Sequence, residues 1–100
     1  MNIQIHAKEF TASEQLTDFI RQKVEKLRHY FDHIIDVEVF LSLESKSSQV
    51  KDKVAKVKVN IPGYQLIAGE SSKLFEEAID LSIDSIKKQL TRHKEKIASK

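Results

Sequence analysis

The sequence predicts an α+β fold in which one four-stranded mixed sheet carries two helices on one face, in the chain order β-α-β-β-β-α. Three observations support this prediction. Four short segments alternate apolar and polar residues, as half-buried strands do. Two longer segments repeat apolar residues at helical spacing. The length of 100 residues, with 40% apolar and 32% charged, suits a single globular domain over residues 1–100.

A short strand and a long helix open the chain. Ile3, Ile5 and Ala7 alternate with polar neighbours, which predicts the strand. A capping box follows, with Thr11 as the N-cap and Glu14 three residues later. The helix is predicted over residues 12–31, with an apolar stripe of Leu16, Phe19, Ile20, Val24, Leu27, Tyr30 and Phe31.

Three further strands with short links should pair as an antiparallel meander. Residues 37–43 and 55–61 alternate, and the polar residues 44–52 between them predict an exposed connection. Pro62-Gly63 is a favoured turn pair and precedes the last strand, residues 64–69. The sheet face opposite the helices should be mostly polar and solvated, with Gln4, His6, Phe40, Ser42, Lys56, Lys58, Asn60 and Ile67 on it.

The second helix begins after Ser71 or Ser72, either of which can serve as its N-cap. Its apolar stripe consists of Phe75, Ile79, Ile83, Ile86, Leu90 and Ile97. Because both helices are amphipathic and each strand has one apolar face, the helices should pack on the same side of the sheet.

Several classes of protein fit the sequence poorly. The chain has no cysteine, no apolar run long enough to span a membrane and no leader-like N-terminus, so we expect a cytoplasmic protein without membrane association. Gly63 and Gly69 are the only glycines, which rules out a glycine-rich phosphate loop, and no nucleophile elbow is present. We expect neither an enzyme nor a bound cofactor.

Two sets of side chains could suggest a metal ion. His29 and His33 are four residues apart, with Asp32 and Asp36 nearby, but no third strong ligand has a recognisable spacing. A row of acids on the second helix, made of Glu76, Asp80 and Asp84, is better explained as solvated surface in the half of a helix where its dipole favours acids. The sequence therefore predicts no metal site.

Basic residues concentrate at the end of the chain. Residues 87–100 contain six Lys or Arg and one Glu, whereas the first 86 residues carry a net charge of −3. The helix dipole favours cations only in the last turn, so it does not account for cations spread over about four turns. Lys88, Arg92 and Lys96 form one row beside the apolar stripe. Such a row suits a phosphate backbone, where Lys and Arg displace condensed counterions.

Other residues could extend this basic surface. Lys87 and Lys94 lie on the other side of the stripe, and Lys23 and Lys26 come from the first helix. Lys23 alternatively packs its stem and keeps its ammonium in water. Tyr30 and His93 could add stacking, although His93 also suits the edge of the core.

Two other binding modes suit the sequence less well. Base stacking on the open sheet face is disfavoured because only Phe40 supplies an aromatic ring there. A membrane surface is less suitable, since the core uses the apolar side of the basic helix.

The residues also resemble a known family. The segments SEQLTDFIRQKVEKLRHYFDHI (13–34) and AIDLSIDSIKKQLTRHKEK (78–96), and the element order around them, are similar to short-form ribosome hibernation promoting factors. The resemblance implies a fold like that of double-stranded-RNA-binding domains. It implies binding to rRNA of the small ribosomal subunit at the mRNA/tRNA decoding region and silencing of translation. Short forms assist ribosome dimerisation alongside another small factor, and we expect a monomer away from the ribosome.

The same resemblance implies which residues face rRNA. Six basic residues match family positions that face rRNA, and His93 matches a histidine of close relatives; the six are Lys23, Lys26, Lys88, Arg92, Lys94 and Lys96. With Arg28 and Lys87 added, the predicted RNA-binding set is Lys23, Lys26, Arg28, Lys87, Lys88, Arg92, His93, Lys94 and Lys96. The sequence departs from the family pattern at Leu74, Glu76 and Ser85, where an acid, an aromatic residue and a lysine are usual. From a length of 100 residues we expect a short form, without the additional C-terminal domain of the long forms.

Two other functions fit the charge pattern. A general double-stranded-RNA-binding module would use the same basic surface for naked duplexes. A protein-interaction adaptor would instead use it to bind an acidic partner.

Overall fold

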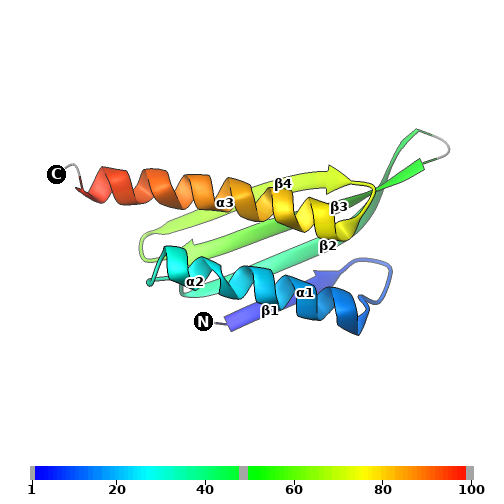
Figure 1. The fold of residues 1–100 in the computed structure, drawn as a ribbon. Coiled ribbons are helices and arrows are strands. Elements are labelled where there is room, and N and C mark those ends of the chain that lie inside the picture. The colour runs from blue at the N-terminus through cyan, green and yellow to red at the C-terminus, as the bar shows by residue number, and fades with distance from the viewer. Residues whose placement is uncertain (1, 48–49, 99–100) are drawn as a thin grey trace.

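A four-stranded mixed sheet forms one layer of the protein, as the sequence predicts (Figure 1). The computed structural model describes the backbone of residues 2–47 and 50–98 and the side chains of residues 2–44 and 52–96. The strands are β1 (Asn2–Ala7), β2 (Asp36–Ser47), β3 (Val50–Ile61) and β4 (Tyr64–Ser72). They lie in the order β1-β2-β3-β4, with β1 parallel to β2 and the other two pairs antiparallel.

The helices cover one face of this sheet. They are α1 (Glu14–Glu25), α2 (Leu27–Tyr30) and α3 (Phe75–Ala98). α1 and α3 lie side by side and run in the same direction, and the last turns of α3 extend beyond the sheet (Figure 1). The ends of α2 and α3 therefore share one end of the molecule.

The strands turn their apolar residues toward the helices. Val57 and Val59 are fully buried, whereas Lys56 and Lys58 beside them lie on the other face. The predicted stripe of α3 is buried at Phe75, Ile79, Ile83, Ile86 and Leu90. Ile97, the last predicted stripe residue, lies outside the described side chains. The alternation and the helical spacing together place the core between sheet and helices.

The first helix differs from its prediction at both ends and in the middle. It begins at Glu14 and is divided at Lys26 into α1 and α2, although the backbone of Lys26 keeps right-handed helical angles. The Ser13 hydroxyl oxygen accepts a hydrogen bond of 3.1 Å from the Leu16 amide. The prediction of Thr11 as the N-cap was therefore wrong, because Ser13 has the extended backbone that lets its side chain reach the first free amides.

This capping contact can be tested by substitution. Ser13→Ala is expected to lower the free energy of unfolding by about 0.5–2 kcal/mol, because the hydroxyl that accepts from Leu16 is lost. Thr11→Ala, two residues earlier, is expected to change it by less than about 0.5 kcal/mol, since Thr11 is exposed and outside the helix. Urea denaturation followed by circular dichroism measures both values. A larger loss for Thr11→Ala than for Ser13→Ala would contradict the assignment.

The predicted connection over residues 44–52 is largely strand. β2 and β3 continue pairing past Leu43 and Lys53 to Ser47 and Val50, with a register shift between Ser45 and Ser47. Residues 48 and 49 lie outside the described part of the chain. The prediction failed because this hairpin is held by backbone hydrogen bonds and has no apolar alternation from which a strand could be recognised.

The prediction of the turn before β4 is confirmed, whereas the predicted N-cap of α3 is wrong. The turn at Pro62-Gly63 is confirmed, and Gly63 has a φ of 79°, which glycine adopts without strain. The prediction that Ser71 or Ser72 caps α3 was wrong, because both serines belong to β4. The chain leaves the sheet after them, and α3 begins only at Phe75.

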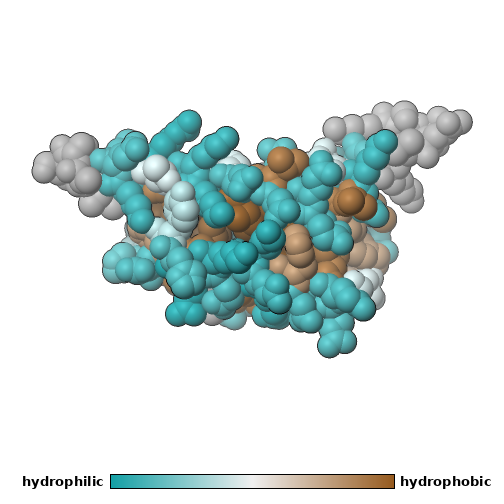
Figure 2. Space-filling model, viewed as in Figure 1, coloured by the Kyte–Doolittle hydropathy of each residue, from teal (hydrophilic) through white to brown (hydrophobic). Residues whose placement is uncertain are grey.

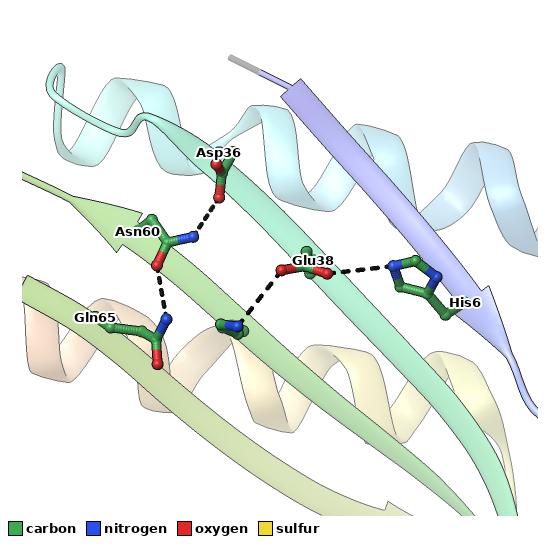
Figure 3. Close-up of polar contacts among 6 residues, drawn as sticks. His6, Asp36, Glu38, Asn60 and Gln65 are labelled. Carbon is green, nitrogen blue, oxygen red and sulfur yellow. Dashed lines mark hydrogen bonds and ion pairs between the residues drawn. The ribbon is translucent and has the colours of Figure 1, made fainter.

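The face of the sheet opposite the helices is mostly polar, as predicted. Figure 3 shows two sets of contacts on it. In the first, Asn60 donates to the Asp36 carboxylate and accepts from Gln65. In the second, the Glu38 carboxylate lies 3.3 Å from His6 Nε2 and 3.5 Å from Lys58 Nζ. We refer to this surface as the open face.

Candidate nucleic-acid interface

The neighbouring ends of α2 and α3 form a shallow basic groove. This helix-end groove has a volume of about 330 Å³ and is lined by Tyr30, Lys87, Lys88, Thr91, Arg92 and Glu95. Lysine and arginine contribute most of its charge, while Glu95 lowers it. The groove exists because α1 and α3 run in the same direction, which brings Tyr30 against the basic half of α3.

Tyr30 lies between the two predicted flanks of basic residues. The ammonium groups of Lys87 and Lys94 each lie 5.7 Å from the centre of its ring. A cation in this position is attracted by the electrons of the ring face. Tyr30 is 42% exposed although the sequence placed it on the buried stripe. Its ring thus attracts two lysines, of which Lys87 lines the groove.

The predicted row on α3 faces solvent. Lys88, Arg92 and Lys96 are all exposed, at a spacing of one helical turn. Among the described residues, Lys88 and Arg92 take part in no ion pair. Their charges are therefore available to an anion outside the chain.

The predicted cations of the first helix lie elsewhere. Lys23 Nζ is 3.2 Å from an oxygen of Asp80 on α3, and it also lies 5.4 Å from the Phe19 ring centre. Arg28 pairs with Glu25 at 3.3 Å. Lys26 and Arg28 line a separate depression of about 450 Å³, together with Glu25, His29 and Asp32. None of the three lysine and arginine side chains lines the helix-end groove.

His93 packs within an aromatic cluster. Its ring meets Phe31 at 5.8 Å and Tyr64 at 4.7 Å between centres, both edge to face. Phe31 closes α2 and Tyr64 follows the turn after β3, so His93 joins three elements. Tyr64 was not expected here from the sequence, because Tyr64 and His93 are distant along the chain and belong to different elements. A contact between His93 and RNA stays a prediction.

All acidic residues of α3 except Glu95 lie in its N-terminal half. Glu76, Glu77, Asp80 and Asp84 precede the basic residues along the helix, and all belong to its first three turns. Over the C-terminal half of α3 the surface is mainly hydrophilic, and larger apolar areas lie toward the N-terminal half (Figure 2). A polyanion is thus attracted to one end of α3 and repelled from the other.

The two sets of side chains considered for a metal are not assembled into a site. Asp36 is hydrogen-bonded to Asn60 on the open face, and Asp80 pairs with Lys23. Across residues 2–47 and 50–98, no three His, Cys, Asp or Glu side chains are grouped so that they could hold a metal ion. No helix within the same residues is long and apolar enough to cross a membrane.

Comparison with known proteins gives consistent matches along the chain. The family model described as "Sigma 54 modulation protein / S30EA ribosomal protein" matches residues 3–98. A ribosome hibernation promoting factor from Salmonella typhimurium is 38% identical over 97 residues, which cover 97% of this chain and 95% of that protein. A ribosome hibernation promotion factor from Bacillus subtilis is 33% identical over all of this chain, which spans 52% of that relative.

Two solved structures share the fold. A ribosomal subunit interface protein from Coxiella burnetii superposes with a TM-score of 0.83 at 20% identity, over 94% of this chain and 98% of the other. The N-terminal domain of Protein Y from Thermus thermophilus superposes with a TM-score of 0.80 at 26% identity, over 93% of this chain and 99% of the other. Since the family model spans nearly the whole chain, this protein belongs to the Sigma 54 modulation protein / S30EA ribosomal protein family.

Proposed function

We propose that this protein is a ribosome hibernation factor, which binds rRNA of the small ribosomal subunit at the mRNA/tRNA decoding channel and silences translation. The relatives that carry the name ribosome hibernation promoting factor support the general role. The proposed binding site is assigned from the basic residues of the helix-end groove. The proposal includes assistance of ribosome dimerisation together with another small factor, as the family resemblance implies.

One observation carries the proposal. Lys88 and Arg92 are exposed on a helix that is packed against the sheet, and neither forms an ion pair with a described acid. Fixed cations of this kind bind phosphates without an entropic cost of ordering a tail. Each contact also releases counterions from the RNA, so that binding is stronger at low salt.

The shape of the molecule supports a blocking mechanism. It is an elongated body, 51 Å long and 26 by 19 Å across. A rigid body held by phosphate contacts excludes mRNA and tRNA from the space that it occupies. It requires no chemical step, and it leaves when the salt-sensitive contacts are broken.

Sedimentation of the purified protein with small ribosomal subunits tests this function. The protein is expected to sediment with the subunits at low salt and to be released as salt is raised, with the logarithm of affinity falling by about 0.7–0.9 per phosphate contact for each unit of log salt. The proposal fails if the protein does not sediment with subunits at low salt, or if its binding is indifferent to salt.

Competition with naked duplex and a pulldown with ribonuclease treatment separate the two alternatives. A general double-stranded-RNA-binding module would be displaced from subunits by an equal mass of naked RNA duplex. A protein adaptor would keep its partners in a cell-extract pulldown after ribonuclease treatment. A hibernation factor is expected to resist the duplex and to lose its ribosomal partners after ribonuclease treatment.

A further inference from the structure

The open face carries an aromatic pair that the sequence did not predict. The rings of His6 on β1 and Phe40 on β2 stack at 5.0 Å between centres and 19° between planes. The two residues are direct partners in the parallel pairing of their strands. Phe40 therefore has a second ring behind it, in the middle of a face that was expected to offer a single aromatic side chain.

A depression lies on the other side of Phe40. It has a volume of about 380 Å³ and is lined by Phe40, Lys56, Lys58, Gln65 and Ile67. Phe40 is 36% and Ile67 is 45% exposed, so the depression has an apolar surface in contact with solvent. The strand register explains the opening, because Lys56 is paired with Gly69, which has no side chain to cover it.

The polar groups around the depression favour an anion next to a flat apolar group. Lys56 is exposed and makes no ion pair with any described residue. Lys58 shares the Glu38 carboxylate with His6, which leaves Lys56 as the unneutralised charge. The side-chain amide of Gln65, which also lines the depression, donates a hydrogen bond of 2.9 Å to Asn60 (Figure 3).

We propose that the open face binds single-stranded RNA, with one base stacked on Phe40 and the adjacent phosphate on Lys56. Every base has a flat face that stacks on an aromatic ring, and a neighbouring cation binds the backbone. The Gln65 amide lies where it can donate to or accept from the edge of the base. A duplex would not fit, because its bases are already stacked and paired.

This site is separate from the helix-end groove. The groove lies on the helical side of the sheet, while Phe40 and Lys56 lie on the opposite side. The inference therefore does not depend on the proposed function, and it gives the protein two RNA-binding surfaces of different kinds. The groove would hold structured RNA by its phosphates, and the open face would hold an unpaired segment by one of its bases.

Nuclear magnetic resonance on the isotope-labelled full chain locates the site. The probe is a hexaribonucleotide of alternating cytidine and adenosine, which cannot pair with itself. Its addition is expected to shift the amide signals of Phe40, Lys56 and Ile67. Shifts confined to α2 and α3 would overturn the proposal, and so would equal shifts at Phe40 and Lys56 on addition of a hexaglutamate peptide.

Fluorescence anisotropy with the same labelled oligonucleotide measures the contribution of each side chain. The measurement is made in a Lys88→Gln/Arg92→Gln background, in which the helix-end groove is weakened. Phe40→Leu is expected to weaken binding about tenfold, as the loss of one base stack does, whereas Phe40→Tyr keeps the ring and should stay within about twofold. Lys56→Gln should weaken binding and reduce its salt dependence by about one phosphate contact.

Two results of this titration would overturn the proposal. One is that the Lys88→Gln/Arg92→Gln protein binds the oligonucleotide with the same affinity with and without Phe40→Leu. The other is loss of all binding in the Lys88→Gln/Arg92→Gln background, which would assign the oligonucleotide to the groove. The resonance shifts on the unsubstituted protein decide the question independently if a Phe40 variant fails to fold.

Discussion

Replacing Lys88 and Arg92 with glutamate is expected to abolish binding to the small ribosomal subunit. Both side chains line the helix-end groove and neither forms an ion pair with a described acid. A hydrogen bond to a charged group contributes about 1.5–3 kcal/mol, so losing two lowers affinity by roughly 100-fold to 10,000-fold. The introduced carboxylates add repulsion from the phosphates. Co-sedimentation and inhibition of translation in a cell-free system measure the two consequences.

A matched control separates the groove from total charge. Lys8→Glu/Lys73→Glu changes the net charge by the same amount at two exposed residues outside the groove. Lys8 directly follows β1, and Lys73 lies between β4 and the start of α3. This control should bind within a few-fold of the unsubstituted protein, and both variants should retain the native circular dichroism. If the two variants lose binding equally, total charge is responsible. If the Lys88→Glu/Arg92→Glu protein still silences translation, the groove has been wrongly assigned.

The fold was predictable where each residue reports its own environment. Val57 and Val59 alternate with Lys56 and Lys58, and the structure buries the valines and turns the lysines to the other face. This works because a strand places successive side chains on opposite faces. The β2–β3 hairpin beyond Leu43 was missed for the corresponding reason, since its sequence lacks the alternation of apolar and polar residues from which a strand is recognised.

Details at the ends of elements depend on geometry that composition does not contain. Thr11 and Ser13 are both good N-cap residues, and the choice between them is made by the backbone angles that precede α1. Similarly, Ser71 and Ser72 could cap a helix, but the pairing of β4 with β3 retains both of them in the strand. Local sequence preference therefore places a helix end only within a few residues.

The candidate site was predictable only where its residues belong to a single element. The row of Lys88 and Arg92 follows from helical spacing within one element. The ion pair between Lys23 and Asp80 does not, because it requires α1 and α3 to lie side by side in the same direction. The stack of His6 on Phe40 similarly requires the register of two parallel strands that are far apart in the sequence.

Leu90→Ala is expected to lower the free energy of unfolding by about 2–5 kcal/mol. Leu90 is fully buried where the basic half of α3 packs on the core, and its truncation leaves a cavity there. In a domain of this size the loss lowers the melting temperature by roughly 10–20 °C. Thermal unfolding followed by far-ultraviolet circular dichroism should remain a single cooperative transition, because the whole protein shares the core to which Leu90 belongs.

The Leu90 substitution tests whether the basic segment is an integral part of the fold or an appended tail. Leu81→Ala on the same helix is the matched control, since Leu81 is 42% exposed and its truncation should cost less than about 0.5 kcal/mol. If the basic segment were only a tail, Leu90→Ala would reduce the helical signal slightly and leave the melting temperature unchanged. If Leu90→Ala instead lowers the melting temperature of the whole protein, the core fixes the positions of Lys88 and Arg92. Their charges would then be held in place before RNA arrives, which is the condition for binding by a rigid surface.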